Sequence, residues 1–173
     1  GYTLYNKGTK KLSSIIGTEA RAVVIENSGT LRITNGTVTS STSQGALNNN
    51  GNMIVDGATV TNTGTRQAIY NSGGNLLVTG NSYLSTTSRS ERAVIQGYKP
   101  NGASSAGTIT IDGATIVSDT PASKNRGAVE IPATCTVIIK DANITSNNLM
   151  GIDNKGTLIL GDKDGTAGNT TPL

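Results

Sequence analysis

The chain has 173 residues, a net charge of +3 and no histidine, tryptophan or phenylalanine, and aromatic residues make up only 3% of it. Without histidine it lacks the most common metal ligand and the most common general base, which disfavours catalysis built on either. With so few aromatic residues, aliphatic side chains must fill the interior. No apolar run approaches the ~20 residues that a membrane-spanning helix needs, so no membrane insertion is expected.

A short phrase of alternating apolar and polar residues recurs along the chain, for example at residues 29–38, 51–60, 107–116 and 135–144. This alternation is typical of half-buried strands, and Asn-Gly or Asp-Gly pairs close many of the runs as turns do. Two apolar columns emerge: Leu31, Met53, Leu76, Ile109, Val137 and Leu158, then Ile33, Val55, Val78, Ile111, Ile139 and Leu160. A third column holds Val38, Val60, Ile116 and Ile144, with Leu84 or Tyr83 in the longer copy.

Two further columns precede each phrase. A small residue recurs upstream, as Ala22, Ala46, Ala68, Ala93, Ala128 and Gly151 with its neighbour Ile152. Asparagine recurs directly before the phrase as Asn27, Asn49 and Asn154, with Asn71 one place off. Because asparagine tolerates left-handed backbone and its amide can bond the same side chain in the next copy, these residues are interpreted as a structural ladder.

Each copy has room for about three short strands, which is one coil of a parallel β-helix. One coil cannot bury its inward side chains alone, whereas coils stacked ~4.8 Å apart pair their backbones and lay like residues over like. The sequence therefore predicts an all-β, right-handed, single-stranded parallel β-helix of about six to seven coils, with three short strands per coil. Residues 1–173 form a single domain in this interpretation. The right hand follows from the preference of parallel crossovers.

The lone cysteine, Cys135, lies two residues before the inward-facing Val137 and is expected to be a buried thiol. No disulfide can form within the chain. The sequence begins inside an expected strand and ends without the capping repeat that solenoids need. We therefore expect a fragment of a longer protein, monomeric within a larger multidomain chain, with any signal peptide outside it.

Several phrases resemble a known class of repeat. They are "NSGTLRITNGTVTSS" at 27–41, "GALNNNGNMIVDGATVTN" at 45–62, "QAIYNSGGNLLVTG" at 67–80 and "NKGTLILGDKDGTAGNTTPL" at 154–173. They are similar to the degenerate repeats of right-handed parallel β-helix regions in large Gram-positive surface proteins, within the pectate-lyase-like superfamily of folds. The resemblance implies a secreted, cell-wall or cell-surface protein with an adhesive or stalk role, and it names no ligand.

Paired carboxylates are the main sign of a possible enzyme. Asp56 and Asp112 occupy the same outward position in coils two apart, which predicts a separation of roughly 9.6 Å, near the upper end of the carboxyl spacing in inverting glycosidases. Both belong to Asp-Gly pairs, where aspartate favours turns, and Thr79 occupies the coil between them. Turn formation is the favoured interpretation and no enzyme is expected. A polysaccharide lyase or hydrolase fragment is the alternative.

A second acidic feature lies near the C-terminus. Asp162 and Asp164 are spaced as in calcium loops, and Asp153 could join them from the preceding turn. The further ligands and the closing glutamate of an EF-hand loop are absent from the sequence. A solvated turn is therefore favoured, and no metal and no cofactor are predicted, with Asp162 and Asp164 as weak metal candidates.

Basic residues recur just before the small upstream residue, as Arg21, Arg66, Arg92 and Arg126. Stacking would align them at one corner, with Arg89 and Lys124 on the same loops. Such a strip could bind an anionic polymer such as teichoic acid, a uronate or a sulfated host glycan. The alternative is that these are solvated charges that discourage aggregation. Nucleic acid is not expected as a partner, because the strip lacks interleaved aromatic residues.

The fourth copy is longer than the others by about ten residues, and the excess lies at 97–107, with Tyr98 and Lys99 near its start. The loop at 118–126 leaves the same copy. Insertions in solenoids form surface loops, where binding residues often sit. Tyr98 is therefore the leading contact candidate. The full set of candidate ligand-binding residues is Tyr98, Lys99, Arg89, Arg92, Lys124 and Arg126.

Threonine-rich flat solenoids can also order water, which makes ice binding a further alternative. Thr108 with Thr110, and Thr134 with Thr136, form Thr-x-Thr pairs in adjacent copies, but Arg32, Asn52 and Ile54 interrupt the array in earlier ones. The favoured function is a rigid stalk or ligand-presenting adhesin module that binds a host or cell-wall glycan or a host surface protein.

Overall fold

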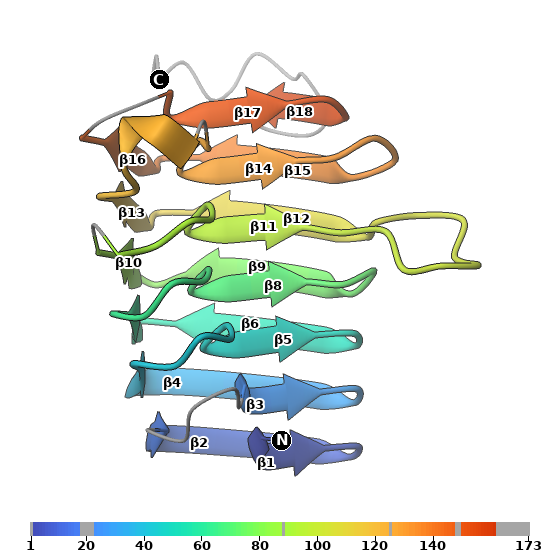
Figure 1. Cartoon of the computed structure of the whole chain (residues 1–173). Coiled ribbons are helices and arrows are strands. Elements are labelled where there is room, and N and C mark those ends of the chain that lie inside the picture. The colour runs from blue at the N-terminus through green and yellow to red at the C-terminus, as the bar shows by residue number, and fades with distance from the viewer. Residues whose placement is uncertain (1, 18–22, 88, 125, 148–149, 162–173) are drawn as a thin grey trace.

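The computed structural model is a column of stacked coils that rises from the N-terminal to the C-terminal end of the chain (Figure 1). It describes residues 2–17, 23–87, 89–124, 126–147 and 150–161. Every pairing between the described strands is parallel. In Figure 1 the front strands run to the right and the rear strands to the left as the chain rises, so the coil is right-handed. The predicted fold class, an all-β parallel β-helix, is confirmed.

A seven-stranded sheet forms the front face in Figure 1, and each of its strands belongs to a different coil. From the N-terminal end it consists of β1 (Tyr2–Asn6), β3 (Val23–Asn27), β5 (Leu47–Asn49), β8 (Ile69–Asn71), β11 (Ile95–Gly97), β14 (Val129–Ile131) and β17 (Ile152–Asn154). We call it the first sheet. Its short strands bury their first and last residues, from β5 to β14, and turn the middle residue outward.

An 11-stranded sheet completes each coil. Its rear strands are β2 (Thr9–Gly17), β4 (Thr30–Ser40), β6 (Asn52–Asp56), β9 (Asn75–Thr79), β12 (Thr108–Asp112), β15 (Thr136–Lys140) and β18 (Thr157–Leu160). Its side strands are β7 (Thr59–Asn62), β10 (Tyr83–Thr86), β13 (Thr115–Ser118) and β16 (Asn143–Ser146).

The long strand β4 pairs with both β6 and β7, so it passes the corner where later coils divide into two strands. From β5 to β16 each coil therefore contains three strands, as predicted, and β17 and β18 are the described strands of the coil that follows. The helical content of the described residues is one 3₁₀ turn, η1 (Ala122–Lys124). No described helix has the length and apolar character that crossing a membrane requires.

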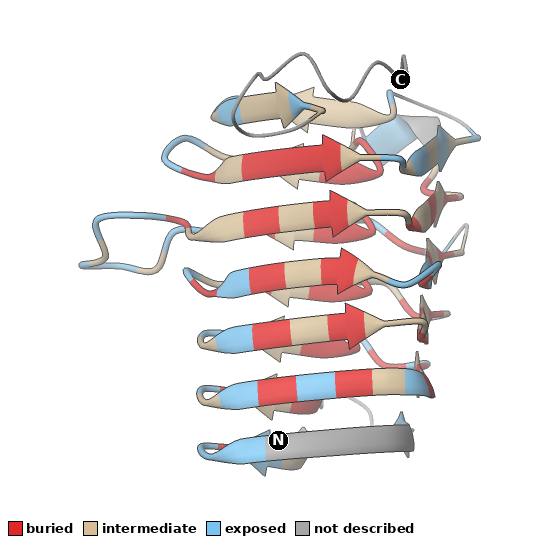
Figure 2. Ribbon diagram, turned by 180° about the vertical axis from the view of Figure 1, so that it is seen from behind, coloured by how far each residue is buried: buried red, intermediate tan, exposed pale blue. Residues whose placement is uncertain are grey.

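The interior consists of aliphatic side chains stacked coil over coil. Leu31, Met53, Leu76, Ile109, Val137 and Leu158 form one continuous register, as the sequence predicts. The same holds for the column from Ile33 to Leu160. Figure 2 shows the alternation of buried and less buried residues along β4, β6, β9 and β12, whereas in β15 the residue between the two columns, Ile138, is buried as well. Each fully buried side chain contributes roughly 1.5–3 kcal/mol through loss of water contact. In the third column Leu84, not Tyr83, pairs with Val60 and Ile116.

The asparagine ladder is more regular than the sequence predicts. Asn71 lies in register with Asn49, not one place off, because the extra residue of that copy is accommodated after Asn71 in the turn. Asn6 also belongs to the ladder. The Nδ2 groups of Asn6, Asn27 and Asn49 each donate to the Oδ1 of the next asparagine at 2.8 Å. The ladder is interrupted above Asn71, where Gly97 and then Ile131 occupy the position that Asn154 regains.

One column was wrongly aligned from the sequence. The small upstream position is filled by Val94, not Ala93, since the backbone N–H of Ile69 donates to the Val94 carbonyl at 2.9 Å. The turn before β11 is longer than those before β5 and β8. Val94 is therefore the residue directly before the strand, and Ala93 lies one position earlier. Ala93 is nevertheless buried. Ala22 lies outside the described residues, and Val24 fills this position in its coil.

Two local predictions are confirmed. The Cys135 side chain is 1% exposed, and burial raises the pKa of its thiol to about 11. The loop between β11 and β12 extends away from the column, well beyond the turns of the other coils (Figure 1).

Candidate functional site

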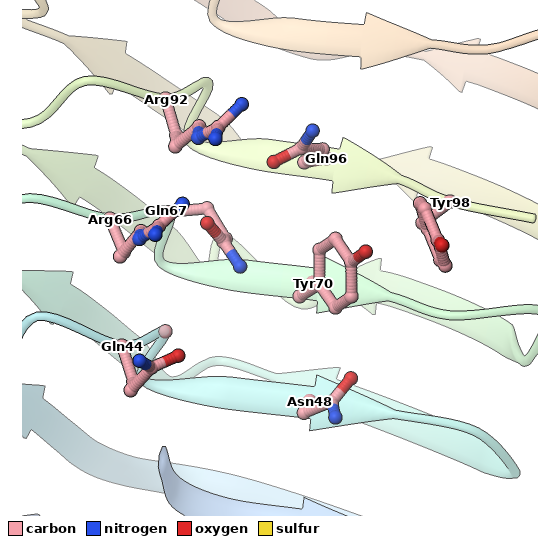
Figure 3. A pocket seen from close by; sticks show the side chains of 9 residues that line it. Gln44, Asn48, Arg66, Gln67, Tyr70, Arg92, Gln96 and Tyr98 are labelled. Atoms are coloured by element: carbon pink, nitrogen blue, oxygen red, sulfur yellow. The ribbon is translucent and has the colours of Figure 1, made fainter. Parts of the chain in front are cut away.

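A groove of about 390 Å³ lies on the outer face of the first sheet, across the coils of β5, β8 and β11 (Figure 3). We call it the arginine–tyrosine groove. Its lining residues are Gln44, Gly45, Asn48, Arg66, Gln67, Tyr70, Arg92, Gln96 and Tyr98. Asn48, Tyr70 and Gln96 are in register with one another as the outward middle residues of their strands. The strand alternation that fills the core thus also builds the floor of the groove.

Arg66 and Arg92 supply the positive charge of the groove. Each lies two residues before the small upstream position of its coil, and Figure 3 shows them one above the other at the amino ends of β8 and β11. Arg66 donates through Nε to the carbonyl of Ser43 at 3.3 Å. The Arg92 side chain makes no hydrogen bond or ion pair with the residues that the structure describes, and none of the lining residues among them is acidic. In the described part of the chain, the positive charge of the groove is therefore balanced only from outside its lining, by Glu91, whose carboxylate interacts electrostatically with both arginines.

Two tyrosine rings stack beside these arginines. The Tyr70 and Tyr98 centroids are 5.2 Å apart, with 29° between the ring planes. Burial raises the pKa of the Tyr70 phenol to about 12, Tyr98 and Glu130 act in the same direction, and Arg92 and Arg66 oppose it. The phenol is therefore neutral at physiological pH and remains a hydrogen-bond donor. Tyr98 is 40% exposed, so its ring is available to a ligand.

Two amide oxygens in the groove lack partners. Asn48 donates through Nδ2 to the Glu26 carboxylate at 2.7 Å, which fixes the orientation of its amide and leaves a buried Oδ1 with no hydrogen bond. Gln67 is 8% exposed, and its Oε1 is also buried and without a partner. Buried polar atoms left unpaired cost free energy, so most are satisfied by protein, water or ligand. The groove thus offers two acceptors for hydroxyl or amide donors.

The sequence prediction selected some of these residues and missed others. Arg92 and Tyr98, both predicted candidates, come together in the groove with Arg66 of the same basic column. Tyr70 and the polar residues Gln44, Asn48, Gln67 and Gln96 were not predicted. A signal for Tyr70 did exist, because it is a large aromatic residue at the outward middle position between the inward Ile69 and Asn71.

Four candidates lie elsewhere. Arg89 is exposed on the loop before β11, and Lys99 is exposed in the insertion; neither lines the arginine–tyrosine groove. Lys124 and Arg126 line a second groove of about 370 Å³, which we call the lysine groove, together with Met150, Asp153 and Lys155. Arg21 lies outside the described residues.

The cations of the lysine groove have carboxylate partners. Lys124 pairs with Glu91 at 3.1 Å, Arg126 with Glu130 at 2.6 Å and Lys155 with Asp153 at 3.4 Å. The ion pair with Lys124 lowers the pKa of Glu91. Unlike the arginine–tyrosine groove, this groove is therefore close to balanced in charge.

The structure also places the acidic candidates. Asp56 and Asp112 share one outward column with Thr79 between them, as predicted. Asp56 forms an ion pair with Arg32 of the neighbouring coil, which ties up one carboxylate. Asp162 and Asp164 lie outside the described residues. Among the residues described, no three histidine, cysteine, aspartate or glutamate side chains lie close enough to hold a metal ion.

The Thr-x-Thr pairs do not form the two-by-two array that ice binding would use. Thr108 pairs with Thr136, but Thr110 pairs with Ile138, because the second pair is shifted by two residues along its strand. Thr134 lies in a turn with a φ of +67°.

Comparison of the chain with protein-family models, with curated proteins and with solved structures finds no match in any of the three.

Proposed function

We propose that this chain is a rigid, ligand-presenting β-helix module of a secreted bacterial surface protein, and that the arginine–tyrosine groove binds an acidic glycan. The carrying observation is the combination of Arg66 and Arg92, which line the groove in adjacent coils, with the unpartnered amide oxygens of Asn48 and Gln67. A guanidinium binds carboxylate or sulfate groups in a fork geometry, and the two acceptors suit hydroxyl donors. An acidic sugar carries both kinds of group.

The tyrosine pair supports a sugar over a small inorganic anion. Pyranose rings have an apolar face of C–H groups that packs on aromatic rings, and Tyr98 offers an exposed ring at the edge of the groove. A free phosphate would use the arginines but would leave the ring and both amide acceptors without contacts. A glycan uses all three features at once.

The wider setting is part of the same proposal. The repeat phrases resemble those of pectate-lyase-like β-helix regions in Gram-positive surface proteins, which favours a secreted, wall-associated adhesin or stalk in which this groove binds a host or cell-wall glycan. A host surface protein that carries such a glycan is the corresponding macromolecular partner. We propose no catalysis, because the carboxylates needed for glycoside cleavage are absent from the lining of the groove within the described chain.

Calorimetric titration of the purified chain tests this function. The probes are oligosaccharides of hyaluronan, galacturonate and heparin, with cello-oligosaccharides as neutral controls. At least one acidic series should bind saturably, and binding should weaken as salt screens the arginines. Arg92→Ala should reduce affinity about tenfold or more, the loss of a charge-assisted hydrogen bond of about 1.5–3 kcal/mol.

Arg89→Ala provides the matched control, since it removes an exposed arginine of the same corner that does not line the groove. Its affinity should stay within about twofold of the unchanged chain. The proposal is overturned if no acidic oligosaccharide binds, or if the two arginine variants lose affinity equally.

A further inference from the structure

We infer that the bound glycan runs along the axis of the column, from the arginine–tyrosine groove into the lysine groove. This inference rests on the proposed function and names the ligand class of the same surface. It assigns a role to a second site, the lysine groove, of whose cations the sequence analysis placed Lys124 and Arg126 in a general basic strip and did not select Lys155.

The two grooves belong to one outward stripe of the first sheet. Its middle residues continue in register from Asn48 and Tyr70 through Gln96 to Glu130 and Asp153. Asn48 to Gln96 line the first groove, and Asp153 lines the second. With coils ~4.8 Å apart, the stripe from Asn48 to Asp153 covers roughly 19 Å, the length of a short oligosaccharide.

The width of the sheet leaves only one direction for a longer ligand. Arg92 lies before the amino end of β11 and Tyr98 follows its carboxyl end, so the first groove already spans the strand from end to end (Figure 3). The next accessible polar hollow on this stripe is the lysine groove, one to two coils further along the axis. A chain that extends beyond the first groove therefore crosses the strands and does not follow them.

The junction between the grooves is Glu130. Its Oε1 accepts from Arg126 at 2.6 Å, whereas its Oε2 is buried and has no hydrogen-bond partner. Glu130 lines neither groove, and its ion pair with Arg126 neutralises its charge, so it does not prevent an acidic chain from crossing β14.

The lysine groove can take the next acidic unit. Lys124 and Lys155 are 41% and 66% exposed, and their ion pairs are of the exposed kind that contributes little free energy and exchanges readily. From Arg92, the coil of Lys124 and Arg126 is one step along the axis and the coil of Lys155 is two steps, ~9.6 Å, which is about the length of a disaccharide. Met150, exposed beside them, offers apolar contact to a sugar ring.

A length series tests the path. Hyaluronan disaccharide, tetrasaccharide and hexasaccharide are titrated into the chain and into Lys155→Ala, with Arg89→Ala as the matched control. The hexasaccharide should bind about tenfold tighter than the disaccharide, and Lys155→Ala should remove most of this gain without changing disaccharide affinity. The inference is overturned if affinity does not rise with length, or if Lys155→Ala affects all lengths equally or none.

Failure of the proposed function looks different. In that case no acidic oligosaccharide of any length binds, or binding does not respond to Arg92→Ala.

Discussion

The rings of Tyr70 and Tyr98 stack at 5.2 Å, although Tyr70 belongs to one coil and Tyr98 opens the long insertion of the next. Aromatic pairs of this kind contribute about 0.5–1.5 kcal/mol beyond burial. If a sugar ring packs against this pair, Tyr98→Ala should weaken acidic glycan binding by about three- to tenfold. Tyr98→Phe, which keeps the ring, should bind within about twofold of the unchanged chain.

Calorimetric titration of both variants with the same oligosaccharide measures the effect, and urea unfolding checks that the fold is kept. Equal affinities for Tyr98→Ala and Tyr98→Phe would show that the ring does not contact the ligand.

The asparagine ladder predicts a large loss of stability on a small change. Asn49 is fully buried, receives a hydrogen bond from Asn27 and donates to the side chain of Asn71, each at 2.8 Å. Asn49→Ala removes both of these bonds and those that the Asn49 side chain makes with the backbone of Asn75 and Gly51, and it leaves the Oδ1 of Asn71 without its donor. Since a buried unpaired group costs about 1–3 kcal/mol and each lost hydrogen bond adds to this, the free energy of unfolding should fall by roughly 3 kcal/mol.

Equilibrium urea unfolding followed by circular dichroism measures this change. Asn101→Ala, in the exposed insertion, is the control and should shift the free energy of unfolding by less than about 0.5 kcal/mol. A loss below about 1 kcal/mol for Asn49→Ala would mean that the ladder is not a stabilising feature.

The sequence predicted the fold well because the fold has one dominant physical rule. Inward positions must be aliphatic in every coil, so Leu31 and Met53 could be aligned from residue type alone, and the register followed. Alignment failed where the turn length changed. Ala93 is small and buried, as expected of a residue in that column, but the strand register and the backbone hydrogen bond from Ile69 show that Val94 fills the position.

The groove was harder to predict because binding surfaces have no such rule. Arg92 and Tyr98 could be selected by charge and by the insertion. Gln67 and Asn48 could not, because an amide residue in a turn or a strand carries no sign of whether its oxygen will be buried without a partner. That property depends on neighbours in other coils, such as Glu26 beside Asn48.

Two glycines with nearly the same backbone conformation should respond differently to alanine. Gly107 and Gly102 have φ values of +84° and +82°. A Cβ on Gly107 would lie 2.1 Å from the carbonyl oxygen of Gly74, whereas one on Gly102 meets nothing within 4 Å. Gly102→Ala should cost about 1–2 kcal/mol for the left-handed conformation alone, and Gly107→Ala should cost at least ~2 kcal/mol more.

Thermal unfolding of the two variants under one set of conditions makes the comparison. If both variants lose the same free energy of unfolding, the Gly74 carbonyl does not exclude a Cβ at Gly107, and the predicted steric conflict between successive coils is wrong.

The buried thiol predicts slow chemistry in the folded state. Cys135 is 1% exposed and the pKa of its thiol is raised to about 11 by burial, so very little thiolate is present at neutral pH. A disulfide reagent at about pH 8 should modify the folded chain at least a hundredfold more slowly than the urea-unfolded chain, where the thiol has its ordinary pKa. Similar rates in the two states would contradict the burial of Cys135.

Glu26 predicts a pH dependence of stability. Burial raises the pKa of its carboxyl above the ordinary value of 4.5, and hydrogen bonds from Asn48 and Asn50 oppose this rise only in part. The folded chain therefore holds this proton more tightly than the unfolded chain. The stabilising contribution is fully present below pH 4.5 and is lost as the pH rises through the raised pKa of the folded state.

Glu26→Gln removes the titration while keeping the shape of the side chain. The free energy of unfolding of the unchanged chain, relative to that of Glu26→Gln, should therefore be highest in acid and should decline as the pH rises above 4.5. Urea unfolding of both proteins across this range gives the difference, and carbon-detected NMR titration gives the carboxyl pKa directly. A Glu26 pKa at or below 4.5, or a difference that grows as the pH rises, would show that hydrogen bonding from Asn48 and Asn50 outweighs burial at this carboxylate.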